Sequence, residues 1–309
     1  MTSTDLKCNP IPAARRPEIW PGPMEGVGRA DFVRAVNRLR LVDRWLTPFW
    51  RVSASGAPRP RQAAGFLAPF LEGGIPVTLQ LLGDDPAALA AAAVEFRRQG
   101  AAGIDLNCGC PSRRVIGHGG GGDLLRHPGT IVAILSAIRG ALGGEVPLSC
   151  KLRCGFSSPE ESGPLLARLA GSGLVDRVFL HFRTVQEGYS AVPDRAGRLR
   201  RAVRAAAGLP VVVNGDITDA ADGSKLAAET GAAGVMAARG WLRDPWLLRR
   251  LAEPGRRDFP APEEGRELFY AEVRRAGAAG GHAVEIAKML WGADSPRFRA
   301  ELAALGPAK

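Results

Sequence analysis

The chain has 309 residues, of which 46% are hydrophobic and 23% charged, enough for one large globular domain with a small appendage. No apolar run approaches the ~18 residues that a membrane helix needs, and the first 20 residues lack the apolar core of a secretory signal. These features predict a cytoplasmic protein without a membrane partner, and we expect it to be a monomer.

The formal net charge is +10, and arginine contributes most of the excess. The planar guanidinium group matches phosphate groups, so we expect an anionic partner, and tRNA or another nucleic acid is the natural class. A genome rich in G and C would also favour arginine over lysine. Such a bias changes the kind of cation more than it changes the net charge.

Residues 1–17 are polar and interrupted by prolines, which predicts a flexible leader. Beyond them, apolar runs of strand length alternate with helical stretches. The predicted strands cover residues 19–27 (with the loop that ends the strand), 45–52, 76–83, 103–108, 147–154, 177–183, 210–214 and 234–238. The predicted helices cover residues 29–39, 85–100, 123–141, 159–172, 195–207, 218–230 and 244–252. Asp84 or Asp85 would cap the second helix, and residues 53–64 are predicted to be an exposed loop.

This alternation is typical of an α/β protein with a parallel sheet. Strands such as residues 210–213 are continuous apolar runs, as expected for strands buried on both faces. The alternation of eight strands with helices favours a closed (β/α)8 TIM barrel over an open doubly wound sheet, and no GxGxxG motif follows the first strand. We assign the barrel to residues 18–253 and a linker with a small helical appendage to residues 254–309.

The stretch from Ile104 to Gly122 joins a strand end to a Cys-Gly-Cys-Pro turn, two arginines and a glycine run. Backbone with so few side chains lets a flat ligand or a phosphate chain approach closely. We interpret Cys110 as a reactive thiol that faces this ligand, and Cys108 as structural. The glycines at 119–122 are interpreted as room for the substrate backbone and for the start of the next helix.

The five cysteines are an odd number in a long chain that is expected to be intracellular, so no disulfide framework is predicted. Cys150 and Cys154 are separated by three residues, and only His118 offers a nearby third ligand for zinc. Buried thiols beside a pocket are the preferred interpretation, and no metal is predicted.

Catalytic groups of such barrels lie at the carboxyl ends of the strands. Polar residues stand there along the whole chain. They are Met24 with Glu25, Gln80, Asn107, Cys110, Lys151 with Arg153, His181 with Arg183, Asn214 with Asp216, and Arg239 with Gly240. Any one of them could be a core hydrogen-bonding residue, but eight strands that all end in polar groups favour a functional site.

Several segments resemble, in order and spacing, those of the tRNA-dihydrouridine synthases. They are PMEGV, LQLLG, DLNCGCPS with GHGGGG, CKLRCG, LHFRT with QEGY, NGDI and ARG. The resemblance extends from about Pro23 to Trp246 and continues weakly through the IAKMLW segment around Lys288. The NCGCPS spelling, the glycine run and QEGY are most similar to the bacterial subgroup that acts on uridine 16 of the D-loop.

The resemblance implies an FMN-dependent barrel that reduces the C5=C6 bond of a uracil in tRNA, with NADPH as reductant. Hydride would reach C6, and Cys110 would give a proton to C5 as general acid. The matching positions for FMN are Pro23, Met24, Glu25, Gln80, Lys151, His181, Asn214, Gly215, Asp216, Ala238, Arg239 and Gly240. Among these, Arg239 and Gly240 would hold the phosphate through guanidinium and backbone N–H groups.

Positions expected to meet the tRNA are Asn107, Arg113, Arg114, Arg183, Arg274 and Lys288. Asn107 and Arg183 would orient the uracil, and the others would meet phosphates. Phe182 replaces a glycine that is usual beside the flavin-side histidine, Ala238 also replaces a glycine, and the helical part that ends soon after Phe298 looks short. Two alternatives therefore stay open: a flavin barrel that reduces a small pyrimidine or enone, and a non-catalytic relative that binds tRNA.

Overall fold

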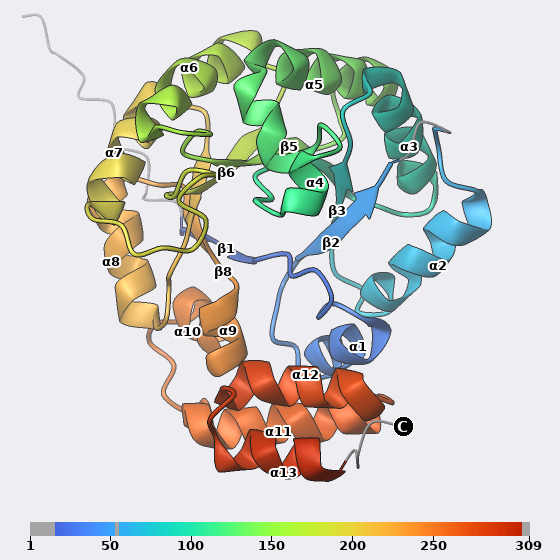
Figure 1. The fold of residues 1–309 in the computed structure, drawn as a ribbon, viewed down its shortest axis with the longest axis vertical. Coiled ribbons are helices and arrows are strands. Elements are labelled where there is room, and N and C mark those ends of the chain that lie inside the picture. The colour runs from blue at the N-terminus through green and yellow to red at the C-terminus, as the bar shows by residue number, and fades with distance from the viewer. Residues whose placement is uncertain (1–15, 53–55, 305–309) are drawn as a thin grey trace, which may run out of the picture.

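The computed structural model describes residues 16–52 and 56–304. Eight parallel strands follow one another in a single curled sheet, with β1 next to β8 and then β7 through to β2. β1 and β2, at the two ends of this order, also lie against each other. The helices surround the strands (Figure 1), so the predicted (β/α)8 barrel is confirmed. The leader predicted at residues 1–17 falls almost wholly outside the described residues.

The eight strands occupy the predicted places along the chain. They are β1 (Glu18–Pro21), β2 (Trp45–Arg51), β3 (Val77–Leu82), β4 (Gly103–Cys108), β5 (Leu148–Arg153), β6 (Arg177–His181), β7 (Val211–Asn214) and β8 (Gly234–Ala237). The helices of the barrel are α1 (Ala30–Arg38), α2 (Pro60–Leu71), α3 (Pro86–Arg98), α4 (Arg113–Ile116), α5 (Pro128–Leu142), α6 (Ser162–Ser172), α7 (Arg195–Ala205), α8 (Ala220–Thr230), α9 (Arg239–Arg243) and α10 (Leu247–Ala252). Short 3-10 turns precede α5 and α6 at Gly121–Arg126 and Pro159–Glu161.

Two of the predicted boundaries are wrong, and proline explains both. Residues 60–64 were expected in a loop, but α2 begins at Pro60 and buries Ala63, Leu67 and Phe70. The helix expected from residue 123 begins at Pro128. Proline fits the first helical position because its missing N–H would be unpaired there in any case. The prediction that Asp85 caps α3 is confirmed, since its carboxylate accepts the N–H of Ala88 at 2.6 Å.

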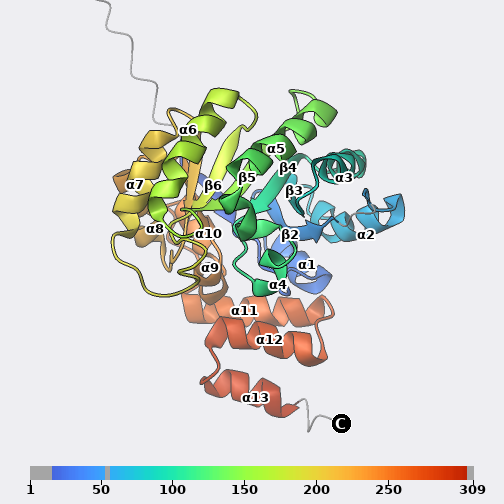
Figure 2. The same cartoon turned by 45° about the horizontal axis from the view of Figure 1, so that its top comes forward.

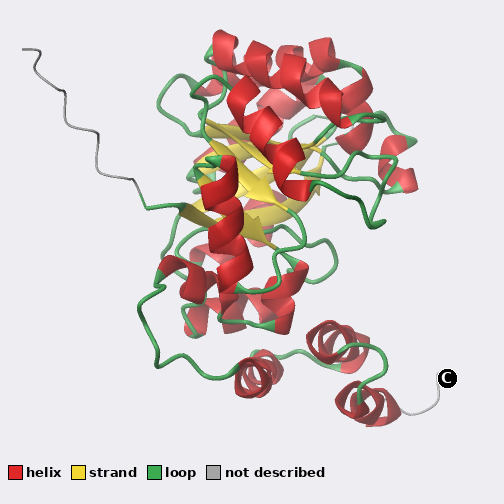
Figure 3. Ribbon diagram, turned by 90° about the vertical axis from the view of Figure 1, so that its left-hand side faces the viewer, coloured by secondary structure: helices red, strands yellow, loops and turns green. Residues whose placement is uncertain are grey.

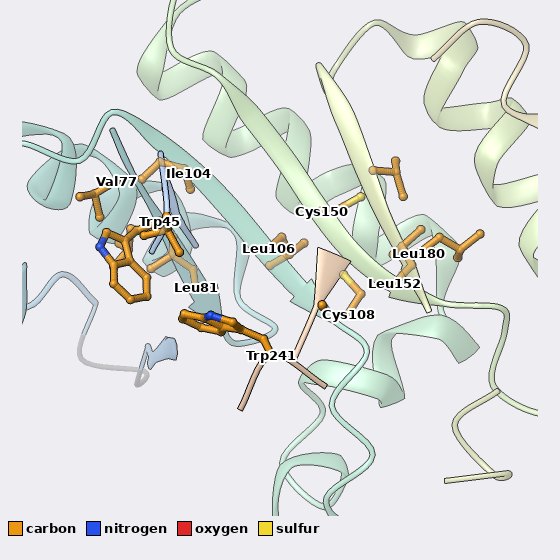
Figure 4. Packing of buried hydrophobic residues seen from close by; sticks show 14 of the residues in the cluster. Trp45, Val77, Leu81, Ile104, Leu106, Cys108, Cys150, Leu152, Leu180 and Trp241 are labelled. Atoms are coloured by element: carbon orange, nitrogen blue, oxygen red, sulfur yellow. The ribbon is translucent and has the colours of Figure 1, made fainter. Parts of the chain in front are cut away.

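The barrel buries two separate apolar layers. Alternate strand residues face the helices, and Leu106, Cys108 and Leu152 belong to this large outer cluster (Figure 4). A smaller cluster inside the ring contains Trp20, Leu46, Phe179, Val212 and Met236. Cys108 is fully buried and its pKa is raised well above the usual value by burial, in agreement with a structural role.

Three further helices, α11 (Pro262–Arg275), α12 (Gly280–Trp291) and α13 (Pro296–Ala304), form a layer beside the barrel (Figures 2 and 3). Phe269 packs edge-on against Phe32 of α1, with 5.3 Å between the ring centroids. His282 Nδ1 lies 2.8 Å from Asp31 Oδ2 of the same barrel helix. The appendage is thus docked on α1, and the domain division at residue 254 stays a prediction. In the part of the chain that the structure describes, no helix is long and apolar enough to cross a lipid bilayer.

The contact between Phe269 and Phe32 predicts how strongly the appendage contributes to stability. Phe269→Ala should lower the free energy of unfolding by about 3 kcal/mol, because it leaves a cavity at a site that is 2% exposed. The melting temperature should fall by roughly 6 °C for a chain of this size. Leu268→Ala is the matched control: this neighbour is 47% exposed, so its removal should change stability by less than about 0.5 kcal/mol. Equal melting temperatures for the two variants would contradict the docking.

Candidate active site

A cavity of about 790 Å³ opens at the carboxyl ends of the strands. All residues that the resemblance assigned to FMN line it, from Pro23 at the end of β1 to Gly240 after β8. Cys110, Asn107 and Lys288 line it as well. The volume lies within the range of roughly 300–1,000 Å³ that is usual for cofactor and substrate sites. The structure therefore brings most of the predicted positions into one cavity, while the role of each residue stays a prediction.

Cys110 follows β4 on a turn that is held by side-chain amides. Asn107 Oδ1 accepts the backbone N–H groups of Gly109 at 3.1 Å and of Cys110 at 3.0 Å. Asn107 Nδ2 donates to Gln80 Oε1 at 2.8 Å, and Gln80 Nε2 donates to Asp105 Oδ2 at 2.8 Å. Asn107 lines the cavity, but both the oxygen and the nitrogen of its side-chain amide already form hydrogen bonds within the protein.

Asp105 was missed by the sequence interpretation. It is completely buried, and this burial raises its pKa to about 6, while hydrogen bonds from Ser149 and Gln80 oppose the rise. Ser149 Oγ donates to Asp105 Oδ1 at 2.7 Å. The signal that could have revealed it is its spacing: Asp105 lies two residues before Asn107 on the same strand, so both side chains face the inside of the barrel.

The glycine run packs beneath Cys110. A Cβ atom at Gly121 would lie 2.6 Å from Val115 Cγ1 and 3.1 Å from Cys110 Cβ. One at Gly122 would lie 2.8 Å from the carbonyl oxygen of Cys110, which accepts the Gly122 N–H at 3.0 Å. These two glycines let the chain pass close under the cysteine turn, and the 3-10 turn that precedes α5 begins at Gly121, as expected. Their expected role in making room for the substrate backbone stays a prediction.

Two titratable groups of the cavity have strongly altered pKa values. Burial lowers the pKa of Lys151 to about 8, and the nearby charge of Arg153 adds to this effect. Burial also lowers the pKa of His181 well below its usual value, and the cations Lys151, Arg153, Arg183 and Arg239 lower it further. His181 is consequently neutral at pH 7. Its Nδ1 accepts the backbone N–H of Arg183 at 3.2 Å, so Nε2 carries the ring hydrogen and can act as a donor.

Arg183 forms a bidentate ion pair with Asp216, at 3.1 Å and 2.5 Å. Its Nε donates to the carbonyl oxygen of Ser190 at 2.6 Å. Arg239 Nη2 reaches the same carboxylate at 2.8 Å. Burial alone would raise the pKa of Asp216, but the hydrogen bond from Arg183 and the surrounding arginine charges lower it. Arg183 is buried, does not line the cavity and uses its guanidinium group to hold Ser190 and Asp216. Its expected contact with the uracil stays a prediction, and this geometry does not favour it.

Arg153 and Tyr189 also line the cavity, and neither was assigned a role from the sequence. Arg153 Nε donates to the carbonyl oxygen of Gly109 at 2.9 Å, and its Nη1 donates to those of Thr184 at 2.9 Å and Gly188 at 2.7 Å. Tyr189 is 63% exposed at the cavity mouth. The guanidinium groups of Arg153 and Arg239 lie 5.5 Å and 5.0 Å from its ring centroid. The aromatic end of the QEGY segment was the signal for this residue.

Phe182 does not crowd the cavity. Its side chain is 2% exposed and stacks on His181, with ring centroids 5.2 Å apart and an angle of 10° between the ring planes. A Cβ at Gly215 would lie 2.4 Å from Phe182 Cδ1, and Gly215 has a φ of +122°. Glycine at position 215 therefore provides the space that the larger residue at position 182 occupies.

The remaining predicted cations lie around the cavity or farther away. Arg113 and Arg114 are exposed on α4, and Arg274 is exposed on α11. Glu285, Lys288 and Met289 come from one face of α12, and Gly292 directly follows this helix. All four line the cavity, so the appendage forms part of its wall. Among residues 16–52 and 56–304, no group of three or more His, Cys, Asp or Glu side chains is arranged to hold a metal ion.

The packing under Cys110 leads to a prediction about glycine. Gly122→Ala should lower the stability by about 1–3 kcal/mol, because the new methyl group would overlap the Cys110 carbonyl oxygen and Val185. Gly140→Ala, in α5, is the control, since a Cβ there meets no atom within 4 Å. This control should gain about 0.5–1 kcal/mol from the higher helix propensity of alanine. Thermal unfolding measures both, and a Gly122→Ala protein as stable as the wild type would contradict the packing.

Comparison with known proteins agrees with this site. The family model described as "Dihydrouridine synthase (Dus)" matches residues 22–280. A probable tRNA-dihydrouridine synthase of Rhodobacter capsulatus is 34% identical over 239 residues, which cover 76% of this chain and 71% of that protein. A tRNA-dihydrouridine(16) synthase of Vibrio vulnificus is 34% identical over 232 residues, covering 73% and 72% of the two chains.

Solved structures share the fold at low sequence identity. A 2-naphthoyl-CoA reductase complex superposes with a TM-score of 0.60 and 12% identity, covering 76% of this chain and 50% of that one. The structure of TcOYE with pHBA gives a TM-score of 0.54 and 11% identity, covering 84% and 95%. At this level of identity, these two likenesses show the fold alone. The match of the family model over most of the chain, together with the two relatives, shows that this protein is an enzyme of the dihydrouridine synthase (Dus) family.

Proposed function

We propose that the protein reduces the C5=C6 bond of a uridine in the D-loop of tRNA to give 5,6-dihydrouridine, with FMN as cofactor and NADPH as reductant. The observation that carries this proposal is the arrangement of Cys110, Lys151 and His181 in one cavity of about 790 Å³. Uridine 16 is the proposed target, since the sequence resembles that subgroup and the Vibrio vulnificus relative is named a tRNA-dihydrouridine(16) synthase.

The electrostatics of the cavity support a flavin nucleotide. Burial lowers the pKa of His181, and the charges of Lys151, Arg153, Arg183 and Arg239 lower it further. The gathering of these four cations indicates a positive site that would favour a phosphate and a negatively charged ring. Arg239, with a side chain that is 61% exposed, would hold the phosphate. Gln80 and Lys151 would bind the polar edge of the ring, and the neutral His181 can donate from Nε2 without adding a charge.

The proposed reaction needs one hydride and one proton. A reduced flavin would supply the hydride to C6, the far end of the enone formed by C6, C5 and the C4 carbonyl group. The negative charge that develops toward C5 is then neutralised by the Cys110 thiol proton. The thiol must keep its proton until this step, so Cys110 acts as an acid and not as a nucleophile. Lys151, which lies close enough for its charge to interact with Cys110, keeps the site positive during the transfer.

Charge and exposure support a tRNA substrate. The net charge of +10 would attract the phosphate backbone, and the exposed Arg113 and Arg114 lie directly after the cysteine turn. Lys288 reaches the cavity from the appendage and could bind a phosphate next to the target nucleotide. A base that enters this cavity must leave the stack, which suits a nucleotide of a folded RNA loop better than one in a regular duplex.

Complementation of a strain that lacks the gene tests the proposal. The wild-type chain should restore dihydrouridine at position 16, mapped by digestion of tRNA, and Cys110→Ala should not. In the purified protein we expect Cys110→Ala to retain bound flavin and its reduction by NADPH, because only the proton donor is removed. Normal dihydrouridine without the gene, with no second synthase present, would reject the function. Weak tRNA binding that does not depend on salt would instead favour a small-molecule substrate.

The pKa of Lys151 predicts how flavin reduction depends on pH. Because this pKa is lowered to about 8, the ammonium group loses its proton as the pH rises above that value. The rate of flavin reduction by NADPH depends on this charge, so it should be nearly constant near pH 7 and should decrease by about tenfold toward pH 9. Lys151→Arg keeps the charge at all these values and should abolish the decrease. An unchanged profile in that variant would assign the titration to another group.

A further inference from the structure

A buried carboxylate lies at the far end of a hydrogen-bond chain that leads to Cys110. Asp105 does not line the cavity, yet it is joined to the cysteine turn through two amide side chains. Gln80 Nε2 donates to Asp105 Oδ2, and Asn107 Nδ2 donates to Gln80 Oε1, each at 2.8 Å. Asn107 Oδ1 accepts the N–H groups of Gly109 and Cys110 at 3.1 Å and 3.0 Å.

The two ends of this chain determine its direction. A carboxylate accepts hydrogen bonds and a backbone N–H donates them, so the ends are chemically opposite. Two amides between such ends are fully paired only when Gln80 turns its nitrogen toward Asp105 and Asn107 turns its oxygen toward Cys110. Either amide in the reversed orientation would place two donors or two acceptors face to face in a buried site, where polar groups are almost always paired.

We propose that Asp105 is a positioning residue that sets the orientation of both amides and thereby fixes the backbone of Cys110 for proton transfer. Proton transfer by Cys110 rests on the proposed function, whereas the orientation of the two amides does not. The turn is held from two sides, since Arg153 Nε donates to the Gly109 carbonyl oxygen at 2.9 Å while Asn107 accepts the N–H groups. Asn107 in this orientation and Arg153 together hold the backbone of the turn that carries Cys110.

The hydrogen bond from Ser149 to Asp105 Oδ1, at 2.7 Å, offers a matched control. A hydroxyl group can rotate and can either donate or accept, so it does not impose a direction on the amides. Ser149→Ala removes a hydrogen bond from the same carboxylate and leaves the two amide orientations unchanged.

Variants that reverse the direction of the hydrogen-bond chain test the proposal. In Asn107→Asp, the new carboxylate still accepts the two backbone N–H groups, but its second oxygen meets Gln80 Oε1. If Gln80 turns, its oxygen then meets Asp105. The double variant Asp105→Asn with Asn107→Asp restores complete pairing with the opposite direction: position 105 donates to Gln80 Oε1, and Gln80 Nε2 donates to position 107. The net charge of the pair also equals that of the wild type.

The primary measurement is the rate of Cys110 alkylation by iodoacetamide, followed by mass spectrometry of the peptide that contains this residue. We expect Asn107→Asp to lower the rate by about tenfold, and the double variant to return to within about threefold of the wild type, as for strongly coupled sites. Ser149→Ala should stay within about twofold. A purely electrostatic effect of the new carboxylate would persist in the double variant, so a double variant no faster than Asn107→Asp overturns the proposal.

A second measurement applies if Asn107→Asp does not fold. Folded protein from the double variant would then support the proposal, and failure of both variants to fold would count against it. Hydrogen exchange of the Gly109 and Cys110 amides in Asp105→Leu, which removes the acceptor at similar volume, should be about tenfold faster than in the wild type. Unchanged exchange overturns the proposal. Neither readout needs flavin or tRNA, so a wild-type protein that does not reduce uridine would reject the proposed function and leave the positioning role standing.

Discussion

Closure of eight parallel strands into one ring is the constraint on which the site depends. It brings the carboxyl ends of all strands to one rim, so that residues far apart in the sequence, such as Met24, Lys151 and Arg239, line the same cavity. Inside the ring, apolar residues of β6, β7, β8, β1 and β2 form one cluster. A polar chain through Gln80, Asp105 and Asn107 occupies β3 and β4, next to the strand that carries Lys151.

The positive charge of the cavity is costly for an isolated protein and favourable for an anionic ligand. Lys151 loses part of its affinity for protons through burial, and His181 stays neutral for the same reason and because of four neighbouring cations. The Asp216 carboxylate balances Arg183 and Arg239 on one side of the cavity. Under the proposed function, a bound phosphate would balance the remaining positive charge.

The appendage packs against the barrel and also forms part of the cavity wall. Its contacts with α1 bury Phe269, Glu272 and His282, and this docking directs one face of α12 toward the cavity. Glu285, Lys288 and Met289 then contribute to the cavity wall. Under the proposed function, this layer of helices would hold the tRNA while one nucleotide reaches Cys110.

The sequence by itself determined the barrel, because continuous apolar strands and regular helix signals are local patterns, and it determined which polar residues end the strands. The tertiary structure decided how those residues are used. Arg183 forms an ion pair with Asp216, Asn107 holds the cysteine turn, and Gly121 and Gly122 pack beneath Cys110. Such pairings depend on the register of neighbouring strands and on how closely loops approach each other. Arg183 and Asp216 are 33 positions apart, and the nearer pairs depend on the path of the loop that follows β4, so no local pattern in the sequence records them.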